Sequence, residues 1–234
     1  MIALIKRKKP TPPIILGFLY NWYAITDVKN ITNTGWSVPT IAQWDTMGMY
    51  LDPEWVGGYL GGNDAGGPLK ESGTTYWNLP NTDATNTTGF NGRAAGIRVF
   101  GFSTGKYGLG FHLPVEYTIT NTYAVELWYT NNCLRTLGWV PPKEVGTSLR
   151  LIKDSTTLSN GETSTYTGND GKIYNTICIG TQEWLSENLA ETKYNNGDWI
   201  AGFDGGTYTP ISDVAWEALT TGALCAYDDD LGNV

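Results

Sequence analysis

The sequence predicts an α+β fold with small antiparallel sheets, one or two helices and long ordered loops. Three observations support this prediction: 29 glycines with frequent Thr and Asn, which favour short strands and tight turns; one segment with helical periodicity; and several segments in which apolar and polar residues alternate. Of the 234 residues, 41% are hydrophobic and only 16% are charged. A chain of this length and composition can bury a sizeable core.

The clearest helix is predicted from Thr40 onward. Gln43 follows Thr40 at the spacing of a capping box, in which each side chain bonds the backbone of the other residue. Apolar residues then recur at helical spacing, at Ile41, Trp44, Met47 or Gly48, and Leu51. The helix should end before Pro53, because the residue preceding a proline avoids the α region. A short second helix is predicted after Ser212, a plausible N-cap.

Strands are predicted for segments that are β-prone or that alternate, namely residues 18–25, 117–120, 123–130, 147–154 and 172–179. Residues 57–110 are punctuated by glycine, which costs about 1 kcal/mol relative to alanine inside a helix. We therefore expect long loops there, tied down by Trp77 and Phe90. Residues 155–171 are polar and contain the turn signals SNG and NDG, so they should form a linker or a hairpin.

The charge is distributed unevenly. Residues 1–16 contain no acidic residue and form an arm with the basic and proline positions Lys6, Arg7, Lys8, Lys9, Pro10, Pro12 and Pro13. Removing these four basic residues from the 15 leaves 11 against 23 acidic residues, a net charge of −12. Such a body disfavours nucleic acid as a partner. The arm is either a solvated tail or a docking peptide for a groove on a partner.

Targeting signals also bear on the expected location. The prolines that follow the basic run do not fit a secretory signal, and no apolar run approaches the roughly 20 residues that cross a bilayer. We therefore expect synthesis in the cytoplasm with reduced thiols and no insertion into a membrane.

Several long strings resemble one known family. They are GWSVPTIAQWDTM, GGPLKESGTTYWNLPNTDATNTTGFNGRAAGIR, DGKIYNTICIGTQEWLSENLAETKYNNGD and TTGALCAYDD. Together they resemble the Fibrobacter succinogenes major paralogous domain (FISUMP) family, which is abundant in Bacteroidetes and their phages. The string VPTIAQW also resembles the helix start of formylglycine-generating, sulfatase-modifying domains, which have a C-type-lectin-like fold. The resemblance implies that fold here, as a compact α+β domain.

The resemblance also implies an exchanged order of parts. In the usual family order the DGxxY…IGxQxW…ENL part comes first, whereas here it follows the LYNWYA…GWxVP part. We interpret residues 17–234 as one circularly permuted domain, with the family's back part at 17–154, a linker at 155–165 and the front part at 166–234. Asp154 and Lys172 should then flank adjoining strands of one sheet. The alternative is a swapped homo-oligomer in which each front part completes a neighbour.

Candidate chemistry is sparse. His112 is the only histidine, and its surroundings do not resemble a nucleophile elbow, so we expect a structural role. Cys178 should be a small buried hydrophobic residue, and a reactive thiol at Cys133 is the lesser alternative. The resemblance implies a disulfide to Cys225, but Leu151 stands at the other position. No catalytic residue or cofactor is predicted.

Metal binding is not predicted either. The acidic run Asp228–Asp230 and the pair Asn169–Asp170 lack EF-hand spacing, and the sugar-binding calcium signatures of C-type lectins are missing. We interpret the acidic run as a solvated turn rather than a calcium site.

The long-loop surface is the candidate ligand site. Aromatic and amide side chains provide contact area and adaptable hydrogen bonds. The fold class places its variable face at Tyr117, Asn121, Tyr123, Trp128, Tyr129, Asn131 and Asn132. The alternative for Tyr123 and Trp128 is a core position on alternating strand residues. Tryptophans within the family motifs should be structural, namely Trp22, Trp36, Trp44, Trp77 and Trp184.

These observations favour a non-enzymatic phage virion surface protein: a head-fibre, decoration or tail-fibre component, made in the host cytoplasm and displayed on the virion. The arm would bind other virion proteins, and the loop face would bind a host surface glycan or protein. The alternative is a secreted or surface-bound bacterial adhesion module of the same family. A relative of the formylglycine-generating enzymes is a distant third possibility.

Overall fold

The computed structural model describes residues 16–57 and 64–234, so the predicted arm lies outside the described residues except for Leu16. The α-helices within this part of the chain are α1 (Trp22–Ile25), α2 (Ile41–Leu51) and α3 (Asp213–Glu217). All named strand pairs are antiparallel. Few helices combined with several small antiparallel sheets confirm the predicted α+β class.

The largest sheet contains strands from both predicted parts of the chain. Its five strands run in the order β2 (Trp36–Ser37), β8 (Ile152–Lys153), β11 (Gln182–Leu185), β10 (Ile173–Ile179) and β9 (Thr163–Thr167). Ile152 pairs with Ser37 on one side and with Trp184 on the other. The prediction that Asp154 and Lys172 flank adjoining strands is therefore wrong in detail. Strands β8 and β10 share the sheet, but β11 lies between them.

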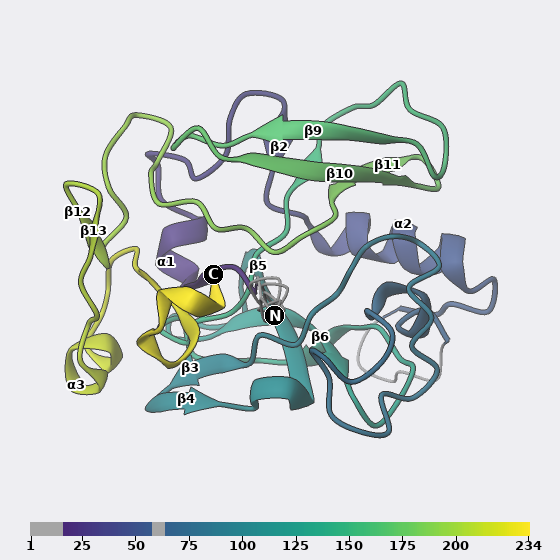
Figure 1. The fold of residues 1–234 in the computed structure, drawn as a ribbon, viewed down its shortest axis with the longest axis horizontal. Helices are drawn as coiled ribbons and strands as arrows, with labels where there is room; N and C mark the ends of the chain where they lie inside the picture. Colours follow the sequence, from purple (N-terminus) through teal and green to yellow (C-terminus); the bar gives the residue numbers. More distant parts are fainter. Residues whose placement is uncertain (1–15, 58–63) are drawn as a thin grey trace, which may run out of the picture.

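A second layer is built mainly from a three-stranded sheet. Its strands are β5 (Gly108–Glu116), β6 (Thr122–Trp128) and β7 (Arg135–Trp139), and the hairpin β3 (Ile97–Val99) and β4 (Gly101–Ser103) accompanies it. In Figure 1 the five-stranded sheet forms the upper layer and β3–β6 the lower one. Two further pairs complete the fold, β1 (Leu19–Tyr20) with β14 (Leu224–Cys225) and β12 (Phe203–Asp204) with β13 (Thr207–Tyr208).

The core between the layers is aromatic. Trp44 of α2 lies 4.8 Å from Trp184 of β11 and 5.3 Å from Phe111 of β5, measured between ring centroids. Trp77 and Phe90, from the long loops, are buried in the same cluster as predicted. Of the other tryptophans expected to be structural, Trp22 and Trp36 are only partly buried and pack against a second cluster.

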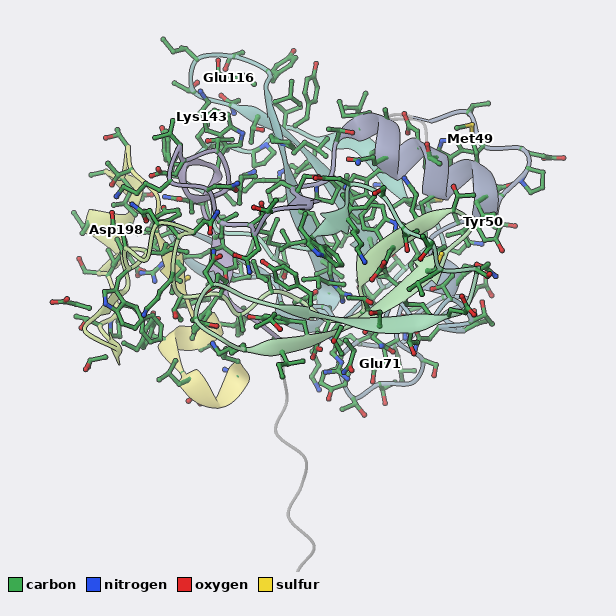
Figure 2. All side chains as sticks on the ribbon, turned by 90° about the horizontal axis from the view of Figure 1, so that it is seen from above. Met49, Tyr50, Glu71, Glu116, Lys143 and Asp198 are labelled. Carbon is green, nitrogen blue, oxygen red and sulfur yellow. The ribbon has the colours of Figure 1, made fainter. Side chains whose placement is uncertain are left out.

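Helix α2 follows from local sequence as predicted. Thr40 caps it and forms a complete capping box with Gln43, and the helix ends at Leu51. Gly48 is required by packing, since a Cβ there would lie 2.5 Å from the ring of Trp55. The exposed side of the helix carries Met49 and Tyr50, which are labelled in Figure 2.

The predicted strand over residues 18–25 is wrong beyond Tyr20. The strand stops because the buried Asn21 caps α1 instead: its Oδ1 accepts hydrogen bonds from the backbone of Ala24 and of Ala223, both at 3.0 Å. An Asn within an aromatic run thus ends a strand and begins a helix. The short helix at Ser212 is confirmed as α3 with that residue as its N-cap.

Other strand boundaries also differ from the predictions. Residues 117–120 form the turn between β5 and β6 rather than a strand, and only Ile152–Lys153 of the segment 147–154 is a strand. Strand β5 was not predicted. The linker is shorter than 155–165, because β9 begins at Thr163 and forms a hairpin with β10. It crosses the end of the sheet, where the Leu158 carbonyl accepts a bond from Cys178 Sγ.

A buried polar node, centred on Arg150 and Asn188, joins the two parts of the chain. The Arg150 guanidinium donates to Asn188 Oδ1 at 2.9 Å and to the carbonyls of Phe90, Leu185 and Asn91 at 2.7, 2.8 and 2.9 Å. Asn188 Nδ2 in turn donates to the Leu16 carbonyl at 2.8 Å. Both side chains are buried, so the ENL motif has a structural role that links segments distant in sequence.

The two ends of the described chain also meet. The Leu16 N–H donates to the Asn233 carbonyl at 2.8 Å, and β1 pairs with β14. A chain that joined these ends would give the usual family order of parts. The contacts between the parts are observed, whereas the permuted origin and the C-type-lectin-like topology stay predictions.

Candidate functional site

The predicted ligand face is divided between the two ends of β6. Tyr117, Asn121 and Tyr123 lie at the turn that joins β5 to β6, whereas Trp128 is the last residue of β6. Trp128 lies five positions after Tyr123 in β6, about 17 Å along the strand. Tyr129, Asn131 and Asn132 follow Trp128. The structure therefore does not bring the seven residues together into one site.

The turn end is small and internally bonded. The Tyr117 ring, 55% exposed, lies 5.1 Å from the Tyr123 ring. Asn121 closes the turn, with its Nδ2 donating to the Val140 carbonyl at 3.2 Å. Figure 2 shows Glu116 and Lys143 close together beside this turn, where an ion pair joins Lys143 Nζ and Glu116 Oε1 at 2.5 Å. These contacts leave Tyr117 as the principal exposed aromatic group.

At the other end of β6 the amide side chains hold the backbone. Asn131 Oδ1 accepts the Cys133 N–H at 3.1 Å, and Asn132 Nδ2 donates to Asp64 Oδ1 at 2.7 Å. Both predicted amides therefore shape the loop, and one polar atom of each is already engaged.

The buried side chain of Lys70 also holds the backbone of this loop. Lys70 Nζ donates to the carbonyls of Thr82, Trp128 and Asn131 at 2.8, 3.1 and 2.7 Å. Burial lowers the pKa of Lys70 to about 8, which leaves the ammonium charged at pH 7 with a carbonyl for each of its three protons. The loop beyond β6 is thus held in one conformation, a condition for precise binding.

Two hollows flank this fixed end of β6. The first, which we call the Trp cleft, has a volume of about 170 Å³. Its lining includes Thr104, Gly108, Gly110, Glu126, Trp128 and Trp139. Trp139 and Glu126 were not predicted as site residues. Glu126 lies two residues before Trp128 on the same face of β6, whereas Trp139 lies beside this face only through the pairing of β6 with β7.

The second hollow, which we call the Tyr hollow, is wider and has a volume of about 480 Å³. It is lined by Thr74, Trp77, Asn78, Leu79, Tyr107 and Tyr129. The rings of Tyr107 and Tyr129 meet edge to face at 5.1 Å, and Leu79 is 76% exposed. Tyr107 precedes Gly108, the first residue of β5, and Tyr129 follows Trp128, the last residue of β6. The two hollows therefore adjoin each other at this end of the β5–β6 pair.

The residues weighed for catalysis lie elsewhere. His112 is buried, its Nε2 lies 2.6 Å from the Val145 carbonyl, and burial lowers its pKa to about 4. The three cysteines are free; Cys178 is buried as predicted, and burial raises the pKa of the buried Cys225 to about 12. Cys133 is partly exposed in the loop beyond β6.

The prediction that the acidic run near the end of the chain is a solvated turn is wrong for Asp229. Asp229 Oδ1 accepts hydrogen bonds from Tyr208 at 2.7 Å and from the buried Arg98 at 3.2 Å. Asp213 also pairs with Arg98, at 3.1 Å. Asp213 thus holds α3, and Asp229 holds the C-terminal segment, against Arg98 of β3. Over residues 16–57 and 64–234, no group of three or more His, Cys, Asp or Glu is arranged to hold a metal ion.

Comparison with known proteins identifies one family. The model of the Fibrobacter succinogenes major domain matches residues 5–153, which is more than half of the chain. No curated protein and no solved structure matches the chain. Among the described residues, no helix is long and apolar enough to cross a membrane.

Proposed function

The chain belongs to the Fibrobacter succinogenes major domain family, and we propose that it is a non-enzymatic surface protein of a phage virion. It would be a head-fibre, decoration or tail-fibre component, and its binding surface would be the end of β6 that carries the Trp cleft and the Tyr hollow. A host surface glycan or protein would be the ligand.

The observation that carries this proposal is the aromatic surface around the fixed end of β6. Tyr107 and Leu79 are 47% and 76% exposed beside the Tyr hollow, and Trp128 and Trp139 flank the Trp cleft. Aromatic side chains provide large contact areas at small cost in conformational entropy. The three hydrogen bonds of Lys70 hold the backbone behind them, which reduces the cost of ordering on binding.

Two features support a binding role over a catalytic one. The ring of His112 is 1% exposed, so a substrate would have no access to it without rearrangement. The thiols of Cys178 and Cys225 are buried, and burial raises the pKa of both, which disfavours the reactive thiolate.

The location on the virion is supported by sequence alone. Residues 1–16 carry Lys6, Arg7, Lys8 and Lys9 with no acid, which suits an anchoring peptide for an acidic groove on another virion protein. Residues 1–15 of this arm lie outside the described residues.

Mass spectrometry of density-purified phage particles tests the location. The proposal predicts peptides of this chain at a fixed ratio to the major capsid protein, retained after a salt wash that removes adsorbed host proteins. If the chain is instead found in the cell envelope as part of a longer, lipid-anchored product, the alternative of a bacterial adhesion module is correct.

Binding of the fluorescently labelled protein to host cells tests the surface. The double variant Tyr107→Ala, Tyr129→Ala should lose binding, whereas Tyr117→Ala, at the opposite end of β6, should retain it. Equal binding by both variants would exclude the end of β6 as the contact.

A further inference from the structure

We propose that the Trp cleft binds a single pyranose ring of a glycan, stacked between Trp128 and Trp139. This inference deepens the proposed function and depends on it for the biological setting, but the binding chemistry can be tested separately.

The pairing of three strands builds the cleft. Gly108 lies opposite Trp128 and Gly110 opposite Glu126, while Ala124 lies opposite Trp139 on β7. Alternate residues of a strand share a face. Leu109 and Phe111 of β5 belong to a core cluster, so Gly108 and Gly110 face the opposite side of the sheet. The residues from Gly108 to Leu113 are all buried, so the cleft is a recess in a covered part of that side.

The glycines of β5 allow the two indoles to lie against the strand. A Cβ at Gly110 would lie 2.9 Å from the Trp139 ring, and a Cβ at Gly108 would lie 3.4 Å from the Trp128 ring. With no side chain at either position, the two indoles can pack directly against the backbone of β5. Neither glycine has a positive φ, so backbone conformation does not require them. Their absent side chains are what let both indoles line the cleft.

Polar groups at the cleft form a neutral pair. Glu126 lines it, and Glu126 Oε1 accepts a hydrogen bond from Arg135 Nη1 at 3.1 Å. Only one oxygen of the carboxylate is engaged in that ion pair, so the other can accept a bond from a ligand hydroxyl. Thr104 adds a hydroxyl to the lining. The cleft thus combines apolar walls with a few polar groups, as small-molecule sites do.

This combination matches a pyranose ring. One or both faces of such a ring expose C–H groups, which pack on an indole, while its rim carries hydroxyls, which bond to a carboxylate. The cleft is small, with a volume of about 170 Å³, so a single ring is the ligand that we propose for it. Further sugars would extend out of the cleft.

A quaternary ammonium ion is the competing ligand, because aromatic pairs with a nearby carboxylate also bind such cations. A bound cation is favoured by an uncompensated negative charge. Here the charge of Glu126 is already balanced by Arg135 at 3.1 Å, and its side chain is only 10% exposed. The pair leaves no net charge for a cation, so the neutral ring is the better match.

Titration of the ¹⁵N-labelled protein with methyl pyranosides tests the proposal. The probes are the methyl glycosides of glucose, galactose, mannose and N-acetylglucosamine, and the signals are the indole N–H resonances, with Trp128 and Trp139 assigned through Trp→Phe variants. We expect at least one glycoside to shift both signals saturably, with a Kd on the order of 1 mM. Trp128→Ala and Trp139→Ala should each weaken binding at least about tenfold.

Two further variants separate loss of the cleft from loss of the fold. Gly110→Ala should also weaken binding at least about tenfold, because its methyl group would displace the Trp139 ring. Trp199→Ala is the matched control: Trp199 is partly exposed but stacks on Phe203, outside the cleft, so affinity should be unchanged. Dispersed indole signals in each variant would show that it is folded.

Two results would overturn the proposal. One is that none of the four glycosides shifts the Trp128 and Trp139 signals; the other is that tetramethylammonium shifts them and no glycoside does. Either result would leave the virion location untouched, since that is measured on particles. Conversely, if the protein binds a sugar but is absent from particles, the proposed virion location is wrong and the proposed ligand of the Trp cleft still holds.

Discussion

Replacing Arg150 by methionine should destabilise the protein more than any exposed charge substitution. The guanidinium is buried between the two parts of the chain and makes four hydrogen bonds, to Asn188 Oδ1 and to the carbonyls of Phe90, Leu185 and Asn91. Methionine fills most of the same volume but has no donor that could replace these four hydrogen bonds.

The expected loss follows from the acceptors left behind. A buried acceptor without a partner costs about 1–3 kcal/mol, and relaxation or an entering water recovers part of that cost. Methionine also removes the penalty of burying a charge, which offsets another part. We therefore expect a net loss of about 4 kcal/mol, a large share of a total stability of about 5–15 kcal/mol.

Urea unfolding followed by tryptophan fluorescence measures this loss. With a slope of about 3 kcal/mol per molar urea, the midpoint should fall by about 1.3 M. Lys29→Met is the matched control, because Lys29 pairs with Asp198 at 3.2 Å on the surface, where both side chains are about half exposed. Its loss should be at most about 1 kcal/mol.

A lysine substitution refines the test. Arg150→Lys keeps the positive charge but lacks the planar fork that reaches several acceptors, so its midpoint should lie between those of the wild type and Arg150→Met. The reasoning is refuted if Arg150→Met unfolds at the same urea concentration as Lys29→Met.

Three further predictions concern pH, helix capping and the thiols. Burial lowers the pKa of His112 from 6.5 to about 4. The unfolded chain therefore binds more protons than the folded chain between these two pH values. The free energy of unfolding should fall by up to about 3 kcal/mol as the pH drops from about 6.5 to 4. Urea midpoints at several pH values should show this fall in the wild type and a smaller one in His112→Gln; equal falls would contradict it. Thr40→Ala removes the N-cap of α2 and should cost about 1 kcal/mol in the same assay, whereas no change would mean that the cap contributes nothing. A thiol reagent should label Cys133 in the native protein and reach Cys178 and Cys225 only in denaturant, so rapid native labelling of all three would contradict their burial.

The parts of the fold that could be predicted are those with local signals. Thr40 and Gln43 define the start of α2 because a capping box involves only four residues. Asn21 shows the limit of such signals. Within its aromatic run it resembles a strand residue, yet its Oδ1 caps α1 through Ala24 and also accepts the N–H of Ala223, about two hundred residues away in sequence. Local propensity could not reveal that partner.

Strand β5 was missed for a physical reason that also concerns the site. Gly108 and Gly110 lower its strand propensity, yet their absent side chains let Trp128 and Trp139 pack against the strand. Trp128 was predicted as a ligand residue on its own, whereas Trp139 becomes its partner only through the register of β5, β6 and β7. Composition indicated an aromatic binding surface, but its location required the sheet.

A density map of purified phage particles tests the central claim most directly. We predict density for this domain on the outside of the virion, with the end of β6 that carries Trp128, Trp139 and Tyr107 facing solvent. A map in which the domain is absent, or in which those side chains are packed against the shell, would contradict the proposed display of this surface.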